Sequence, residues 1–199
     1  MAIRVYKVNT TAKPPKGNFP HYAPLITKSD RDENWLGLDE FNGRPFSKKW
    51  RTLELIISMP RLPRPDFFDF GGSVFVCNER AVELAGDPLE MAGELLPVRV
   101  KGEQGRFWVF NTTNCIEVLD ARKSKWEHWG PAGQYKRLVK PAFVRNRLGE
   151  ISIFKFPEDG ASRIYCIERS GEIADSEFKA TVEHHRLTGL EFELIWSSK

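Results

Sequence analysis

The sequence predicts a single α+β domain with a mainly antiparallel sheet and a few short helices. Many short segments alternate apolar and polar residues and are rich in β-branched and aromatic types, as strands are. Few segments combine a capping residue with a charged, helix-favouring stretch. The chain has 199 residues, 41% hydrophobic and 29% charged, which is enough for one globular domain with its own core. We therefore expect one domain over residues 1–199.

The N-terminal part predicts one strand and a long irregular segment. Residues 3–8 alternate and form the first expected strand. Residues 10–24 contain four prolines and a glycine, which predicts a surface loop. Residues 29–50 mix turn formers with aromatic residues that we expect to anchor this part over the core. Residues 1–52 are thus expected to form a strand and an irregular wrap, before the next strand at 53–58.

The segment Pro63–Ala85 is the most compact motif of the chain. It places two aspartates, three phenylalanines and the pair Gly71-Gly72 before a short apolar run. The glycines permit turn conformations, and residues 73–77 predict a strand. Asn78 is a good N-cap for a helix that Gly86-Asp87-Pro88 is expected to end.

The middle of the chain is predicted to be largely β. A second short helix is expected over about 89–94, and residues 121–142 are polar, basic and turn-rich, so we expect a loop there. Alternating apolar residues predict strands at 98–101, 106–113, 115–120, 143–148, 151–156 and 162–169.

The end of the sequence predicts a helix followed by a strand. Asp175 or Ser176 is expected to cap a helix over about 177–186, and Gly189 stands where a left-handed C-cap belongs. Residues 190–196 then alternate as a half-buried strand does. The inward positions of this strand are predicted to be Leu190, Phe192, Leu194 and Trp196.

The three cysteines form no recognisable disulfide or metal motif, because they are odd in number and widely spaced. Each lies in an apolar, strand-like run, where a free cysteine behaves as a small hydrophobe. We expect Cys77, Cys115 and Cys166 to be buried and reduced. Catalysis by Cys115 or Cys166 with a histidine stays open as the alternative of an enzyme of unknown type.

Other catalytic and cofactor patterns are not found in the sequence. No Gly-x-Gly-x-x-Gly or Gly-Lys-Ser/Thr motif occurs, which argues against nucleotide binding. His184 and His185 are adjacent and would point about 100° apart on a helix, so they cannot grip one metal as an i, i+4 pair. Asp66 and Asp69 are expected to cap turns rather than form an acid–base pair. We expect no catalytic residue, no cofactor and no metal.

The sequence also lacks membrane and export signals. No run of eighteen apolar residues occurs, and the first fifteen residues have neither an apolar core nor a cleavage pattern. We therefore expect a cytoplasmic protein without a membrane partner.

Charge is unevenly distributed, although the formal net charge is only +3. Residues 66–94 and 172–193 are rich in acids. Residues 121–147 carry eight lysines and arginines against Glu127 alone, with Trp126, Trp129 and Tyr135 between them. Such a stretch can be a structural loop, a protein contact or a platform for single-stranded nucleic acid. Nucleic acid is the less favoured partner, because no recognised binding motif accompanies the charge.

An ordered series of motifs runs through the chain: LPRPDFFDFGGSVFVCNERAVELA (62–85), ELLPVRV (94–100), FWVFNTTNCIEVLD (107–120) and HRLTGLEF (185–192). In this order and at these spacings, the series resembles the Imm-eleven-type immunity protein family of bacterial polymorphic toxin systems. The resemblance covers residues 53–196 and departs from the family pattern in the basic stretch.

The resemblance implies a protein without catalytic residues that binds and neutralises one toxin domain encoded by an adjacent gene. Its shared motifs are expected to determine the fold, so toxin contacts are expected where the chain departs from the pattern. The alternatives are a nucleic-acid-binding or adaptor module that uses residues 121–147, and an enzyme. The expected toxin contacts are Arg122, Trp126, Trp129, Tyr135 and Arg137.

Overall fold

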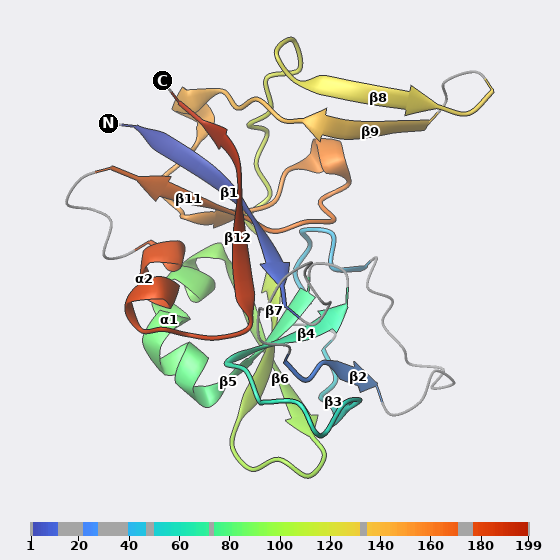
Figure 1. Ribbon diagram of the computed structural model, residues 1–199, viewed down its shortest axis with the longest axis vertical. Helices are drawn as coiled ribbons and strands as arrows, with labels where there is room; N and C mark the ends of the chain where they lie inside the picture. The colour runs from blue at the N-terminus through green and yellow to red at the C-terminus, as the bar shows by residue number, and fades with distance from the viewer. Residues whose placement is uncertain are drawn as a thin grey trace.

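A computed structural model describes residues 2–11, 22–27, 40–46, 50–71, 74–131, 135–170 and 177–198. In these residues the chain forms a small domain dominated by sheet, with two α-helices (Figure 1). The pairing of the strands is mainly antiparallel, as predicted, although one sheet is mixed. Neither described helix is long and apolar enough to cross a membrane.

The first sheet joins the two ends of the sequence. Its order is β10-β11-β1-β12, and every pair is antiparallel. The central strand β1 therefore has both of its neighbours from the last part of the chain (Figure 1). The strands are β1 (Ile3–Thr10), β10 (Ile153–Phe154), β11 (Tyr165–Arg169) and β12 (Leu190–Ser197).

The second sheet has six strands in the order β2-β3-β6-β7-β5-β4. Only the β3–β6 pair is parallel among its described pairings. The strands are β2 (Leu25–Thr27), β3 (Leu53–Ile57), β4 (Phe67–Gly71), β5 (Val74–Asn78), β6 (Gly93–Val100) and β7 (Phe107–Thr112).

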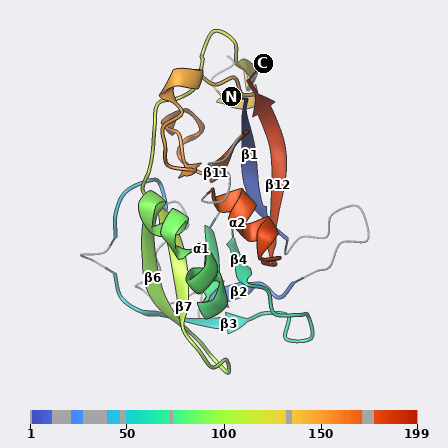
Figure 2. The same ribbon diagram turned by 90° about the vertical axis from the view of Figure 1, so that its left-hand side faces the viewer.

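The helices α1 (Glu79–Ala92) and α2 (Phe178–His184) lie side by side against a core shared by both sheets (Figures 1 and 2). Aromatic rings fill this core: Phe75 stacks on Phe110 at 5.2 Å between centroids, and Phe67 meets the edge of Phe178 at 5.9 Å. Such rings bury large apolar areas in preferred stacked or edge-on geometries, so they fix how α2 sits on the second sheet.

The motif at 63–85 forms the β4–β5 hairpin and the start of α1, and one carboxylate ties it to the end of the chain. Asp66 is buried and accepts hydrogen bonds from the amide of Thr188 at 2.8 Å and from its hydroxyl at 2.9 Å. It also accepts from Asn78 Nδ2 at 3.3 Å and pairs with Arg80 at 2.8 Å. Asn78 caps α1 as predicted, since its side chain accepts from the amide of Ala81.

The break predicted after Ala85 was confirmed as a kink between two helical segments. The chain stays helical to Ala92, with one non-helical residue, Ala85, at φ −125° and ψ 16°. Proline disrupts a helix interior but is tolerated in a first turn, where its missing N–H is not needed. The kink at Ala85 lets Pro88 lie in the first turn of the second segment, which begins before the predicted residue 89 and ends at Ala92.

Two predicted strands were wrong. Residues 115–120 and 143–148 make only isolated bridges, Cys115 with Lys155 and Leu119 with Phe143. A 3₁₀ turn follows at Arg145–Arg147. The apolar alternation in these segments reflects contacts with the core, since Val118, Leu119 and Phe143 are buried there.

The strand β12 forms as predicted but does not alternate throughout. Its pairing with β1 shifts at a bulge, because Val5 lies opposite Trp196 while Tyr6 lies opposite Leu194. Leu194 is 54% exposed, contrary to prediction, although it shares a face with Phe192, and Ile195 packs with Trp196 against the core. Asp175 and Ser176 lie outside the described residues, and the described N-cap of α2 is Glu177, without a side-chain capping bond.

Candidate functional site

The basic stretch forms a β-hairpin where a loop was expected. Strands β8 (Lys125–Trp129) and β9 (Tyr135–Lys140) pair antiparallel and project beyond the body of the domain (Figure 1). The sequence carries a signal for this hairpin that the loop prediction missed. KWEHW and YKRLVK are β-prone runs separated by a Gly-Pro turn signal.

The two faces of the hairpin have different surroundings. Trp126 lies opposite Leu138, and both are partly buried against the core cluster that includes Phe143. On the next pair, Glu127 and Arg137 form a salt bridge of 2.5 Å, with side chains 54% and 62% exposed. Neighbouring pairs point to opposite faces of a hairpin. The first pair therefore anchors the hairpin, and the second faces solvent.

The five predicted contact residues fall in different places. Arg122 is exposed in the turn before β8, and Arg137 is exposed on β9. Trp126 is not an exposed aromatic residue, since it packs toward the core. Trp129 and Tyr135 lie opposite each other where the two strands meet the connecting turn, and their side chains are outside the described part.

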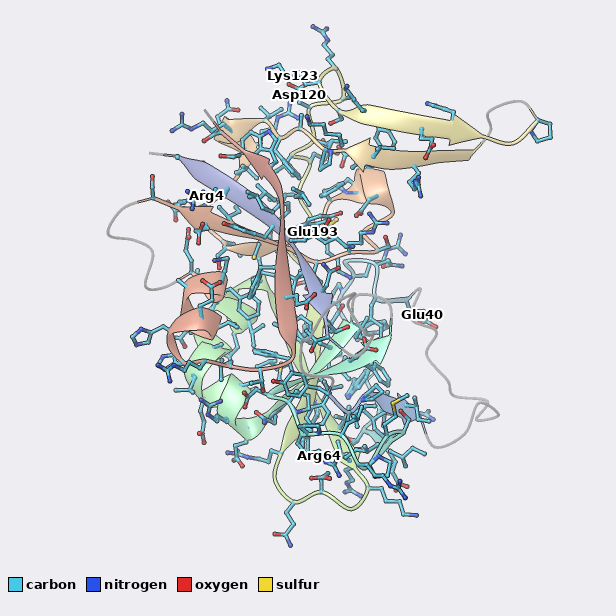
Figure 3. The ribbon with its side chains drawn as sticks, in the orientation of Figure 1. Arg4, Glu40, Arg64, Asp120, Lys123 and Glu193 are labelled. Atoms are coloured by element: carbon cyan, nitrogen blue, oxygen red, sulfur yellow. The ribbon has the colours of Figure 1, made fainter. Side chains whose placement is uncertain are left out.

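A cationic surface covers the hairpin and the 3₁₀ turn beside it. Lys123 reaches Asp120 at 3.5 Å from a side chain that is 79% exposed, and Val139 adds an apolar side chain that is 57% exposed (Figure 3). Clustered charge of one sign steers an oppositely charged partner toward such a surface. We call this the basic hairpin surface; its exposed members are Arg122, Lys123, Lys125, Arg137, Lys140, Arg145 and Arg147.

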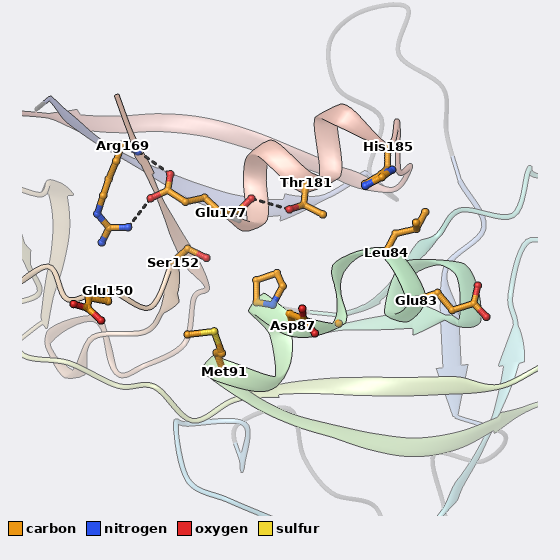
Figure 4. A pocket seen from close by; sticks show the side chains of 12 residues that line it. Glu83, Leu84, Asp87, Met91, Glu150, Ser152, Arg169, Glu177, Thr181 and His185 are labelled. Atoms are coloured by element: carbon orange, nitrogen blue, oxygen red, sulfur yellow. Dashed lines mark hydrogen bonds and ion pairs between the residues drawn. The ribbon is translucent and has the colours of Figure 1, made fainter. Parts of the chain in front are cut away.

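A second surface is the groove between α1 and α2, which sequence reasoning did not identify (Figure 4). Its volume is about 580 Å³, and Met91 beside it is 63% exposed. Glu177 at its wall is buried and binds Arg169 at 2.5 Å, so that pair is internally neutralised. Further carboxylates give the groove an acidic lining: Glu83, Asp87 and Glu150.

The cysteines are only partly as predicted. Cys77 and Cys166 are buried, and burial raises the pKa of both thiols. Cys115 is exposed, contrary to prediction, and lies at an isolated bridge to Lys155. Partial desolvation of its thiol by neighbouring atoms still raises the pKa of Cys115. A thiol needs a lowered pKa to be a good nucleophile, so these environments do not favour cysteine catalysis.

Lys155 is the most unusual ionisable group of the described residues. It is 2% exposed, and its Nζ donates a hydrogen bond to the carbonyl of Phe41. Burial lowers the pKa of Lys155 to about 8. Nearby, Tyr165 donates to Asp159 at 2.7 Å, and burial raises the pKa of both groups. The lysine thus links segment 40–46 to the domain through a buried cation.

We expect Lys155 to make stability rise with pH above 8. Between the folded pKa of about 8 and the usual 10.5, the unfolded chain binds a proton that the folded chain does not, so raising the pH favours folding. From pH 8 to 10 the free energy of unfolding should gain about 2 kcal/mol relative to Lys155→Met. Urea unfolding of both proteins at each pH measures this, with the exposed Lys101→Met as control. Equal slopes in wild type and Lys155→Met would contradict it.

The histidines do not gather with other potential metal ligands. In the part of the chain that the structure describes, no three His, Cys, Asp or Glu side chains are placed to hold a metal ion. His184 ends α2 and His185 follows it, with ring centroids 4.8 Å apart and planes nearly perpendicular. His128 is exposed on β8 of the basic hairpin surface.

No protein-family model matches the chain, and no curated protein matches it at a significant level.

Proposed function

We propose that this chain is an immunity protein that binds and neutralises a cognate bacterial toxin domain, with the basic hairpin surface as its main contact. The Imm-eleven-type resemblance supports the class of protein. The observation that carries the choice of surface is that the hairpin projects from the domain and presents exposed cations beside a packed anchor. The partner surface is therefore acidic.

The packing of the shared motifs supports this division of roles. Asp66, Asn78 and Arg80 from one motif meet Thr188 from the last motif in one hydrogen-bonded network. Residues engaged in this way hold the domain together, which leaves them less suited to contact a partner. The hairpin lies outside the resembling motifs, and a change of its exposed side chains alters few contacts within the domain.

The geometry of the hairpin suits fast capture followed by slow release. Complementary charge raises the association rate with an acidic partner. Apolar and aromatic side chains that become buried in the complex lower the dissociation rate. Val139 is such an exposed apolar residue next to the cations. A single neutralising complex can therefore form without any chemical step by this chain.

The test is binding to the purified toxin domain from the adjacent gene. Arg122→Glu with Lys125→Glu reverses two exposed charges and spares the Glu127–Arg137 salt bridge. We expect association to slow and affinity to fall at least about tenfold. Arg99→Glu with Lys101→Glu, equally exposed but on β6 and the turn after it, is the matched control and should bind normally.

Three results would contradict the proposal. The first is that the toxin domain forms no complex with the wild-type chain at micromolar concentration, and the second is that both double variants bind it equally well. The third is that a single-stranded oligonucleotide binds the wild-type chain with steep salt dependence and loses affinity for the hairpin variant. That last outcome would support the nucleic-acid module, which the same cations favour.

A further inference from the structure

The strand β12 lies at the outer edge of the four-stranded sheet (Figure 2). It pairs with β1 along one side, and no described strand pairs with its other side. From Leu190 to Leu194 the pairing is regular, and the bulge at Ile195 ends this regular part. An open strand edge presents unpaired N–H and C=O groups to which another strand can add.

The hydrogen-bond pattern identifies which backbone groups face outward. The amide of Thr11 donates to the carbonyl of Gly189 at 3.2 Å, so Gly189 points toward β1. The direction of backbone groups alternates along a strand. Glu191 and Glu193 therefore also point toward β1. The outward N–H and C=O groups are those of Leu190, Phe192 and Leu194, and within the described residues no hydrogen bond reaches them.

A groove of about 590 Å³ follows this edge. Phe192 of β12 packs toward α2, whereas Glu191, which lies opposite Asn9 of β1, is on the other face of the sheet. Because residues of both faces line it, the groove runs along the edge of the strand rather than over one face. An added strand would occupy this space.

The groove carries an excess of negative charge. Glu183, Glu191 and Glu193 line it, against Arg186, and Glu183 also pairs with Lys179 at 2.7 Å. Glu193 lies 3.8 Å from Lys7 and remains 60% exposed (Figure 3).

This charge pattern disfavours a second copy of the chain as the occupant. Antiparallel pairing of the regular segment with itself would centre on Phe192 and place Glu191 opposite Glu193 twice. Like charges directly opposite each other destabilise a strand pair. Lysine or arginine at those positions would stabilise it.

We propose that the open edge of β12 binds an extended segment of another polypeptide as an added strand, with Lys or Arg opposite Glu191 and Glu193. Backbone hydrogen bonds to Leu190, Phe192 and Leu194 hold the segment, and the cations select it. This binding function goes beyond the proposed neutralisation, because it involves neither the basic hairpin surface nor the toxin's acidic surface.

The experiment titrates the whole chain with a capped heptapeptide, Thr-Val-Lys-Val-Lys-Val-Thr, and follows backbone amides by nuclear magnetic resonance. We expect amide hydrogen exchange at Leu190, Phe192 and Leu194 to slow at least about tenfold at saturation, since these groups gain acceptors. A peptide with Glu in place of both Lys should not bind. The Lys peptide methylated at the amide nitrogen of its central valine should not bind either, because it has lost a backbone hydrogen-bond donor.

Charge reversal provides the second arm. Glu191→Lys with Glu193→Lys should prefer the Glu peptide, whereas Glu150→Lys in the groove between α1 and α2 should keep the wild-type preference. The proposal is overturned if the three amides are already protected in the free protein, if the chain sedimenting alone is a dimer through β12, or if all peptides bind alike. Failure of toxin binding at the hairpin would leave these results unaffected.

Discussion

Replacement of Gly189 by alanine should destabilise the domain by about 3–5 kcal/mol, a large part of the stability of a typical domain. Gly189 has φ +102°, a conformation that side chains rarely adopt. A Cβ atom there would lie 2.0 Å from the carbonyl oxygen of Phe67 and 2.9 Å from Cβ of Pro65. The neighbouring Thr188 carbonyl accepts from the amide of Phe67 at 3.0 Å, so the two backbones cannot separate without losing that bond.

Three other glycines separate the two causes of this loss. In Gly93→Ala the added Cβ atom would lie 2.1 Å from the carbonyl oxygen of Asn111, but the extended φ of −179° at Gly93 suits any residue. This variant therefore measures the clash alone. Gly102 has φ +82°, and an added Cβ atom there would have open space around it. Gly102→Ala should therefore lower the free energy of unfolding by about 1–2 kcal/mol from backbone strain alone. Gly149→Ala has neither problem and should stay within about 0.5 kcal/mol of wild type. Chemical denaturation measures all four; a Gly189→Ala cost no larger than that of Gly102→Ala would refute the close-approach argument.

Asp66→Ala should cost about 3–4 kcal/mol, the second largest effect that we expect. The change removes the acceptor of the Thr188 amide and hydroxyl, at 2.8 and 2.9 Å, and the ion pair with Arg80. It leaves polar groups without partners where the first and last motifs meet. Denaturant unfolding should show a lower midpoint with an unchanged slope, as expected when only the native state is weakened.

Two milder variants test the hydrogen bond of the Thr188 hydroxyl and the ion pair of Arg80 separately. Thr188→Val keeps the backbone bond to Asp66 but removes the hydroxyl, and should cost about 1–2 kcal/mol. Arg80→Ala removes a side chain that is 49% exposed, and should cost under about 1 kcal/mol. If Asp66→Ala were no more harmful than Arg80→Ala, the buried hydrogen bonds would not be what joins the two motifs.

Local sequence patterns predicted the strands and helix caps for which the contacts made in the folded domain favour the same structure as the local sequence does. The alternation that predicts β1 and β12 and the cap at Asn78 act over a few residues, and both strands and the cap were confirmed, although β12 does not alternate throughout. The segments 115–120 and 143–148 show similar alternation but form only isolated bridges. Strand formation also depends on a pairing partner elsewhere in the chain, which these segments lack. The bulge that places Leu194 and Trp196 on opposite faces of β12 likewise depends on its register with Val5 and Tyr6.

The candidate site was predictable in charge but not in shape. The excess of lysine and arginine over 121–147 predicted an exposed cationic surface, and described members such as Arg122 and Arg137 are exposed. The orientation of Trp126 was not predictable, because its packing partners come from distant parts of the chain. The groove along β12 was also hidden from the sequence, since it combines α2 with an edge that only the strand order reveals.

The central position of β1 affects the order in which the protein can be made and folded. Ile3 donates its amide to the hydroxyl of Ser198, 195 residues later, and Tyr6 reaches Glu168 across 162 residues. During synthesis this strand leaves the ribosome long before either of its neighbours, β11 and β12. Contacts between such distant residues slow folding, and an unpaired apolar strand is exposed to aggregation in the meantime. The four-stranded sheet can therefore close only after Ser197 has emerged, which sets the earliest moment at which a newly made chain can act.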